Sequence, residues 1–188
     1  MATTDKLKTL TGVIFDGDGV LFDGNESRIT LPDNSVGVLK IRSLQDGQGI
    51  SFLRALGLKV VFASGENEPL PSIVKKINDL PAVKNGEWTP VDYFTGELKK
   101  GGKVASLEAW LHKQGLRWED CAYVGDDRTD LEAMKKAGLK VVPANARRVV
   151  QKIADIQLTK AGGAGAIREF AEMVLDARGV DEATLPAA

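Results

Sequence analysis

The feature that most constrains the fold of this chain is a series of short apolar segments separated by stretches with helical periodicity. The segments are rich in β-branched and aromatic side chains, which is typical of strands buried on both faces of a sheet. Four of them lie at residues 13–15, 60–63, 121–124 and 139–142. Between them, apolar residues recur at helical spacing, as at Val104, Leu107 and Leu111. Strands that alternate with helices predict an α/β fold with a doubly wound parallel sheet.

The length of 188 residues predicts one domain with a sizeable core. We expect this domain to span residues 10–178, after a polar leader at residues 1–9 and before a flexible tail at residues 179–188. Two strand-like runs flank the turn-rich sequence PDNS, which predicts a β-hairpin at about residues 26–42.

Composition argues against several classes of partner. The formal net charge is −1 and no basic block is present, so we expect no nucleic-acid or membrane surface. No apolar run approaches the roughly 20 residues of a membrane span, and the N-terminus lacks a signal-peptide core. A single cysteine, Cys121, fits a reducing cytoplasm, and a single histidine, His112, argues against histidine-based catalysis.

Two carboxylates, Asp16 and Asp18, directly follow the first apolar segment. At positions i and i+2 of an extended chain, both side chains project to the same side. Such a pair can hold a hard cation, or one carboxylate can attack while the other moves a proton. An ordinary Asp-Gly turn is the competing interpretation. A calcium EF-hand loop fails on spacing, because its sixth position would be Leu21 and its twelfth Ser27.

Further polar groups follow later strands, and the carboxyl ends of parallel strands meet at one edge of a sheet. These groups are Ser64, Lys103, Asp126, Asp127 and Asp130. Each has a simpler explanation as a helix cap or a surface residue. Together, however, three or four carboxylates repel one another unless a cation is present, and oxygen-only ligands favour Mg²⁺. With a hydroxyl and an ammonium nearby, the set predicts phosphoryl transfer with an aspartate nucleophile.

In its motifs FDGDGV, FASG, GGK and VGDDRTD the sequence resembles the haloacid dehalogenase (HAD) superfamily of phosphatases. The resemblance covers nearly the whole chain. It implies that Asp16 attacks phosphorus and that Asp18 is the general acid and base. It also implies a role for every other polar group of the set: Ser64, Gly65 and Lys103 bind the phosphoryl group, Asp126 ligates Mg²⁺ with Asp16 and the backbone carbonyl of Asp18, and Asp127 and Asp130 are supporting carboxylates.

The spaces between the motifs are too short for a cap domain, which predicts a capless member. The hairpin, the segment QDGQG and the segment GGAGAIRE are similar to the 3-deoxy-D-manno-octulosonate 8-phosphate phosphatase family. That family implies a phosphorylated 2-keto sugar acid as substrate, of the octulosonate 8-phosphate or nonulosonate 9-phosphate type. It also implies a homotetramer assembled through the hairpins. Asp46 and Arg168 are then candidate substrate or tail contacts, with a helix cap and a surface arginine as comparable alternatives.

Three departures from that family bear on the substrate. Glu66 stands where the second motif usually has arginine, Ala164 replaces a basic residue, and the stretch from Glu97 to Gly102 is extra. Glu66 is a candidate substrate contact that should weaken the binding of an anionic ligand.

Two other classes compete with the enzyme. A non-catalytic, phosphatase-like oligomerisation module of sugar-nucleotide metabolism would also have the hairpin and no cap. A phospho-acceptor receiver domain clusters aspartates with a hydroxyl and a lysine, but it places its acidic pair early and the acceptor aspartate on a later strand.

Overall fold

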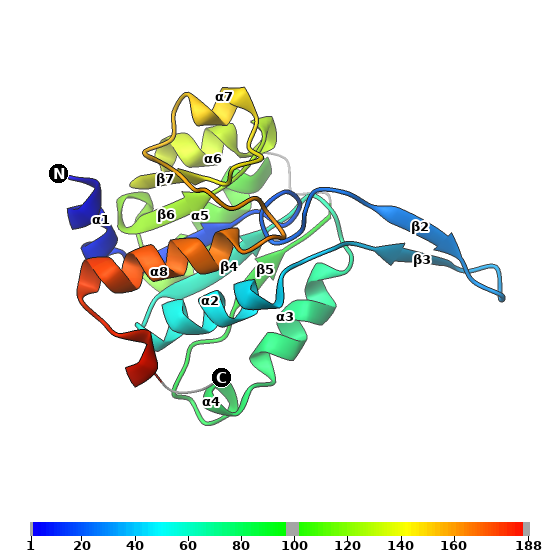
Figure 1. Cartoon of the computed structure of the whole chain (residues 1–188), viewed down its shortest axis with the longest axis horizontal. Helices are drawn as coiled ribbons and strands as arrows, with labels where there is room; N and C mark the ends of the chain where they lie inside the picture. Colours follow the sequence, from blue (N-terminus) through cyan, green and yellow to red (C-terminus); the bar gives the residue numbers. More distant parts are fainter. Residues whose placement is uncertain (1, 97–101, 186–188) are drawn as a thin grey trace.

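The computed structural model describes residues 2–96 and 102–185. Its centre is a six-stranded sheet in which all neighbouring strands are parallel, in the order β5-β4-β1-β6-β7-β8 (Figure 1). The strands are β1 (Gly12–Phe15), β4 (Lys59–Ala63), β5 (Asp92–Phe94), β6 (Cys121–Val124), β7 (Leu139–Val142) and β8 (Ile156–Gln157). The predicted doubly wound α/β fold is confirmed.

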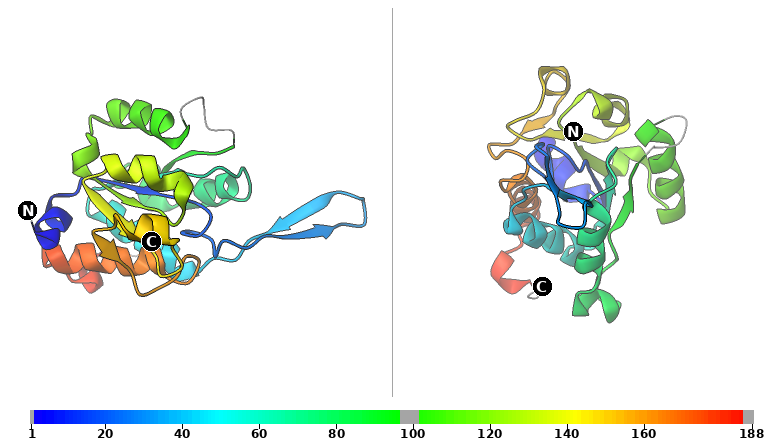
Figure 2. Two further views of the ribbon diagram at one scale, coloured as in Figure 1. Left: turned by 90° about the horizontal axis from the view of Figure 1, so that it is seen from above. Right: turned by 90° about the vertical axis from the view of Figure 1, so that its right-hand side faces the viewer.

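Helices cover both faces of this sheet, as the views in Figure 2 show. They are α1 (Thr3–Thr9), α2 (Leu44–Ala55), α3 (Leu70–Asn78), α4 (Pro81–Lys84), α5 (Gly102–Gln114), α6 (Leu131–Lys136), α7 (Arg148–Gln151) and α8 (Ala166–Arg178). Successive strand side chains point to opposite faces. Val13 and Phe15 therefore join the core with α2 and α8, while Ile14 packs on the side of α5 and α6.

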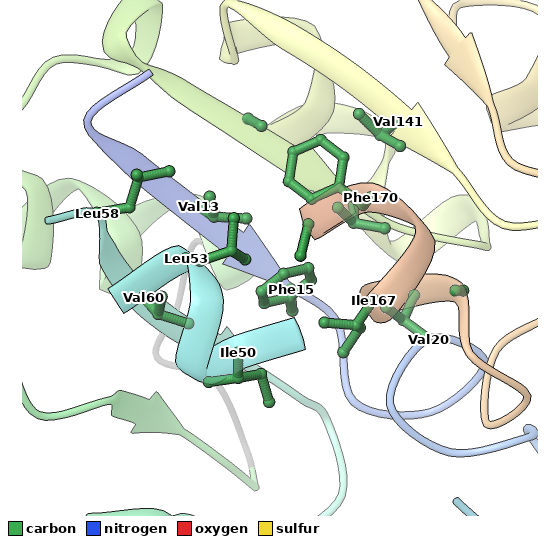
Figure 3. Packing of buried hydrophobic residues seen from close by; sticks show 14 of the residues in the cluster. Val13, Phe15, Val20, Ile50, Leu53, Leu58, Val60, Val141, Ile167 and Phe170 are labelled. Carbon is green, nitrogen blue, oxygen red and sulfur yellow. The ribbon is translucent and has the colours of Figure 1, made fainter. Parts of the chain in front are cut away.

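The central strand β1 is fixed by this packing, seen at close range in Figure 3. The ring of Phe15 lies 5.5 Å from that of Phe62 and 6.4 Å from that of Phe170, centroid to centroid. Val13, Ile14 and Phe15 are fully buried. Because interiors are close-packed, the residue after Phe15 stands on a rigid base.

The strand register places the ends of β1, β4 and β6 side by side. Phe15 pairs with Phe62 of β4 and with Val124 of β6. The next residues along these three strands therefore emerge at one edge of the sheet. Asp16 directly follows Phe15, whereas Ser64 and Asp126 lie two residues beyond Phe62 and Val124.

The predicted hairpin consists of β2 (Ser27–Thr30) and β3 (Val36–Leu39), paired antiparallel with Ser27 opposite Leu39. It projects away from the sheet in Figures 1 and 2. Asn34 adopts a φ of 64° in its turn, a conformation that asparagine tolerates. The chain between β1 and β4, all of which the structure describes, contains only this hairpin and α2, which agrees with a capless protein.

Each chain end contains a short helical segment. The leader is helix α1, whose Leu7 is buried and packs with α8, so one apolar side chain anchors a polar segment. In the tail, residues 182–184 form a 3-10 turn, and Val180 and Leu185 pack against the core. Residues 97–101, most of the predicted extra segment, lie outside the described residues, as do residues 186–188.

Among the helices of the described residues, none combines the length and the apolar character that a bilayer crossing requires.

Candidate active site

A cavity of about 650 Å³ opens at the sheet edge where β1, β4 and β6 end. Most of the predicted site residues line it. They are Asp16, Asp18, Gly65, Glu66, Lys103, Asp126 and Asp127. The structure brings these side chains together around one cavity, as the sequence predicted.

Asp16 is held in place through one carboxylate oxygen. Its Oδ1 accepts hydrogen bonds from Lys103 Nζ at 2.6 Å and from the backbone amide of Gly17 at 2.7 Å. Its own amide donates to the carbonyl of Val124 at 3.0 Å, which ties it to β6. Since both bonds to the carboxylate end on Oδ1, Oδ2 accepts none from the described residues.

Lys103 lies in the first turn of α5 and bridges two carboxylates. Its Nζ also donates to Asp130 Oδ1 at 2.6 Å, and its side chain is 5% exposed. Burial opposes the charge, but Asp16 and Asp130 hold the pKa of Lys103 above its ordinary value. The ammonium is therefore a fixed positive charge at the floor of the cavity.

Asp130 accepts hydrogen bonds from four groups of the site. Its Oδ1 accepts from Lys103 and from the hydroxyl of Tyr123 at 2.8 Å, and its Oδ2 accepts from the amides of Asp126 and Asp127. Two oxygens offer about four acceptor positions, so these bonds use the whole capacity of the carboxylate. Asp130 therefore positions other groups rather than binding a ligand.

Asp126 approaches Asp16 from the end of β6. One oxygen from each of Asp16, Asp126 and Asp130 lies within 4.8 Å of the others. Burial and the charges of Asp130 and Asp127 raise the pKa of Asp126 to about 6, and burial and Asp130 raise that of Asp16 well above its ordinary value. With Asp130 saturated, Asp16 and Asp126 remain as an oxygen-only pair that fits a hard divalent cation.

Asp18 lies closer to the cavity mouth and has different partners. Its Oδ1 accepts from Lys40 Nζ at 2.7 Å, and its Oδ2 accepts from Ser64 Oγ at 3.3 Å. Ser64 Oγ also accepts from the amide of Glu66 at 3.2 Å. The hydroxyl therefore links the end of β4 to Asp18, and the exposed Glu66 faces the cavity.

Close backbone contacts shape the loop after β1. A Cβ on Gly19 would lie 2.1 Å from Asp126 Oδ2, and a Cβ on Gly162 would lie 1.9 Å from the carbonyl oxygen of Gly19. Asn145 bridges the same segments, because its side chain donates to the carbonyl of Gly19 at 3.0 Å and accepts from the amide of Gly162 at 2.7 Å. Glycine is required at residues 19 and 162 for this packing.

Asp127 caps the short turn before α6. Its carboxylate accepts from the amide of Arg128 at 2.6 Å, and the side chain is exposed at the cavity wall. The cap interpretation agrees with this hydrogen bond, and the supporting role at a metal site stays a prediction.

Asp46 and Arg168 are not among the described residues that line the cavity. Asp46 is fully buried and accepts from the amides of Gly165 at 3.3 Å and Arg168 at 3.0 Å, at the start of α8. The guanidinium of Arg168 stacks on Phe52 at 4.4 Å and pairs with Glu182 of the tail. Both residues join α2, α8 and the tail, which corresponds to the cap and tail-contact alternatives.

Four residues at the site were missed from the sequence: Lys40, Tyr123, Asn145 and Arg147. Tyr123 could have been predicted, because it lies on an apolar strand and a buried tyrosine hydroxyl needs a hydrogen-bond partner. For Lys40 the sequence offers no signal, since a lysine in a hairpin ordinarily points to solvent.

Comparison with known proteins agrees with this geometry. The family model described as haloacid dehalogenase-like hydrolase matches residues 58–169, more than half of the chain. The chain belongs to this family. A curated HAD-family relative, the 3-deoxy-D-manno-octulosonate 8-phosphate phosphatase KdsC of Haemophilus influenzae, is 33% identical over 174 residues, covering 93% of this chain and 87% of the relative.

Solved structures of HAD phosphatases have the same fold. The octulosonate 8-phosphate phosphatase of Moraxella catarrhalis, solved with a magnesium ion, a phosphate ion and a KDO molecule, matches with a TM-score of 0.74 and 27% identity, over 94% of this chain and 91% of that one. The cobalt-bound H. influenzae enzyme matches with a TM-score of 0.75 and 30% identity, over 93% and 92%. This chain is accordingly a phosphatase of the HAD type.

Proposed function

We propose that this chain is a Mg²⁺-dependent phosphomonoesterase that acts through an aspartyl phosphate on Asp16. The observation that carries the proposal is the contrast between its two aspartates. Asp16 is buried beside Lys103 with one oxygen accepting no hydrogen bond from the described residues, whereas Asp18 is 31% exposed at the cavity mouth. A nucleophile needs a fixed, desolvated position, and a general acid needs access to the leaving group.

In the first step, a carboxylate oxygen of Asp16 attacks phosphorus, and the bond from phosphorus to the ester oxygen breaks. The electron pair of that bond goes to the leaving oxygen, which takes the proton of the Asp18 carboxyl group. The products are the free alcohol, the aspartyl phosphate and an ionised Asp18. Lys103 offsets the charge of the phosphoryl oxygens.

In the second step, Asp18 takes a proton from a water molecule as the water oxygen attacks phosphorus. The bond between phosphorus and Asp16 breaks, which releases inorganic phosphate and restores the Asp16 carboxylate. Asp18 is protonated again, so one residue is the acid of the first step and the base of the second.

Asp16, Asp126 and the backbone carbonyl of Asp18 would hold Mg²⁺. The bound ion supplies positive charge for the phosphoryl oxygens and lowers the repulsion between the carboxylates. Asp130 and Asp127 support this arrangement through the amides and the turn at the end of β6.

For the substrate we propose a phosphorylated 2-keto sugar acid, of the octulosonate 8-phosphate or nonulosonate 9-phosphate type. The names of the relatives and the KDO complex support this class. Arg147 lines the cavity and offers a cation for a carboxylate, while Glu66 adds a negative charge. We expect Glu66 to shift the preference away from the most anionic esters.

A phosphate-release screen tests the activity. Purified protein with Mg²⁺ should release phosphate from sugar acid phosphates and lose this activity in EDTA, and borohydride should trap the intermediate as a reduced residue at position 16. The absence of turnover on every ester would refute the proposal and favour the non-catalytic oligomerisation module.

We also propose a cytoplasmic homotetramer assembled through the hairpins. The hairpin segment exposes several large apolar side chains, which marks an interaction surface. They are Ile29 (45% exposed), Leu31 (44%), Val36 (58%), Leu39 (55%) and Ile41 (68%). Light scattering should give the mass of four chains, and the double variant Val36→Ser, Leu39→Ser should lower it; a monomeric wild type would contradict this part of the proposal.

A further inference from the structure

Lys40 is a buried cation of the hairpin segment that contacts the site through Asp18. It directly follows β3, and its Nζ lies 2.7 Å from Asp18 Oδ1. Its side chain is 3% exposed, although its neighbours Leu39 and Ile41 are 55% and 68% exposed. The apolar side chains here point to solvent and the charged one points inward, which reverses the usual arrangement.

Burying an ammonium is unfavourable unless a partner repays the lost hydration. Two carboxylates are near Lys40, but they are not equivalent: Asp18 Oδ1 is at 2.7 Å, whereas Glu26 Oε2 is at 4.0 Å. The ring of Phe22 lies 5.6 Å below the ammonium. Asp18 is therefore the principal partner of Lys40.

The two oxygens of Asp18 are held from two separate elements. Lys40 holds Oδ1 from the hairpin, and Ser64 Oγ donates to Oδ2 from the end of β4 at 3.3 Å. Of these two bonds, the one from Lys40 is shorter and charge-assisted, so it should dominate the orientation of the carboxylate. Lys40 does not line the cavity, which separates it from a lysine that would bind the substrate.

We propose that Lys40 is a positioning residue, which orients the Asp18 carboxyl group for proton transfer to the leaving oxygen and thereby makes the hairpin a part of the active site. The inference rests on the proposed phosphatase function, because it assigns a task within the first step of that reaction. Lys40 has no contact with the substrate in this role. It acts only through Asp18.

The identity of the leaving group provides the test. A sugar or other alkyl phosphate expels a poor leaving group and depends on proton donation, whereas p-nitrophenyl phosphate expels a stable anion and does not. General acid catalysis contributes typically ~10²–10⁴-fold. We expect Lys40→Met to lower kcat/KM by ~10²-fold for the alkyl phosphate and only a few-fold for p-nitrophenyl phosphate. Lys40→Arg should recover most of the loss.

Two further measurements keep the test specific. Arg28→Met removes another hairpin cation, one whose partner is Glu26, and should leave kcat/KM unchanged for both esters. In an Asp18→Asn background, Lys40→Met should have no additional effect on the alkyl phosphate, since residues that act through one another are not additive. Circular dichroism melts of each variant show whether the fold is retained; if Lys40→Met unfolds, Lys40→Gln replaces it in the same comparison.

An equal loss on both esters, or an additive loss in the Asp18→Asn background, would overturn the inference while leaving the phosphatase function intact. A wild-type protein that hydrolyses neither ester would instead refute the proposed function, and this inference with it.

Discussion

The active site has two halves with opposite character. The inner half, Asp16, Lys103, Tyr123 and Asp130, lies at the floor, and its three charged side chains are 8%, 5% and 0% exposed. The outer half, Asp18, Lys40, Glu66 and Arg147, surrounds the mouth and belongs to the hairpin and loops. The side chains of the inner half have little freedom because Lys103 forms ion pairs with both Asp16 and Asp130. The outer half contains both buried and exposed side chains.

This contrast separates two tasks. Groups that are fixed in a dry site can stabilise developing charge without reorganising, which is the main requirement of phosphoryl transfer. We expect the exposed groups at the mouth, Glu66 and Arg147, to meet the variable part of the substrate and to tolerate replacement better than Asp18 and Lys40, which serve proton transfer. We therefore expect substitutions in the inner half to abolish activity and those in the exposed part of the outer half to change selectivity.

The largest effect should come from the inner half, at Asp16. Asp16→Asn removes the nucleophile and should lower kcat by at least ~10³-fold, as nucleophile replacements do in other hydrolases. Neutralising one carboxylate of a repelling set should at the same time leave the melting temperature unchanged or raise it. Steady-state kinetics and a thermal melt on the same preparation check both; retained turnover would remove Asp16 from its role.

Asp130→Ala should be next, and it should affect stability as well as activity. It leaves Lys103 with one carboxylate fewer and leaves the Tyr123 hydroxyl and two amides without their acceptor. Breaking a buried charge network of this kind costs about 3–5 kcal/mol in the free energy of unfolding. Urea denaturation measures it.

Asp127→Ala is the matched control for Asp130→Ala, because it removes an exposed cap three residues away. Its cost should not exceed about 2 kcal/mol. Similar losses for the two variants would mean that the inner half has no special energetic role.

Glu66→Arg tests whether the outer half determines substrate selectivity. Replacing a carboxylate by a guanidinium at the mouth should lower KM for sugar acid phosphates by roughly tenfold, or about 1.4 kcal/mol, with kcat little changed. Glu66→Gln should give a smaller change in the same direction. If kcat falls as sharply as for Asp16→Asn, Glu66 belongs to the chemistry and not to selectivity.

The smallest effect concerns metal and pH. The pKa of Asp126 is about 6 in the folded chain, so between about pH 4 and pH 6 the folded state holds a proton that the unfolded state has released. Protonation of Asp126 removes an unfavourable buried charge from the folded state. Without metal, this gain in the free energy of unfolding is fully present below about pH 4 and is lost as the pH rises through 6. Mg²⁺ competes with the proton, so it should raise the melting temperature more at about pH 7.5 than at about pH 5.

Asp126→Asn should abolish that difference. An equal shift with Mg²⁺ at both pH values in the wild type would place the ion elsewhere.

Part of the active site was predictable from the sequence, for a physical reason. Polar residues that follow buried parallel strands must meet at one edge, so Asp16 and Asp126 were brought together by the strand pattern alone. The same pattern identified Lys103 as a candidate, although a single lysine at a helix start is ordinarily a surface residue. The motifs then assigned each residue a task.

The remaining features depend on docking angles that a linear pattern does not contain. Lys40 was missed because alternation along a hairpin does not reveal which face turns inward. Asp46 and Arg168 were candidate substrate or tail contacts only because their segments resemble a phosphatase family. In the structure, Asp46 accepts hydrogen bonds from backbone amides and Arg168 stacks on Phe52. Helix α1 was missed because only Leu7 in it is buried.

The contacts of Gly19 and Gly162 affect how a mutational scan of this protein should be read. Neither residue has a side chain that could take part in chemistry, yet any replacement would drive a carbon atom into Asp126 or into the backbone of the loop after β1. In a saturation library both positions should be as intolerant as Asp16. Positions of the site that do not tolerate substitution are therefore of two kinds: residues that react, and glycines that leave space for neighbouring atoms. Only activity measured on folded variants separates the two kinds.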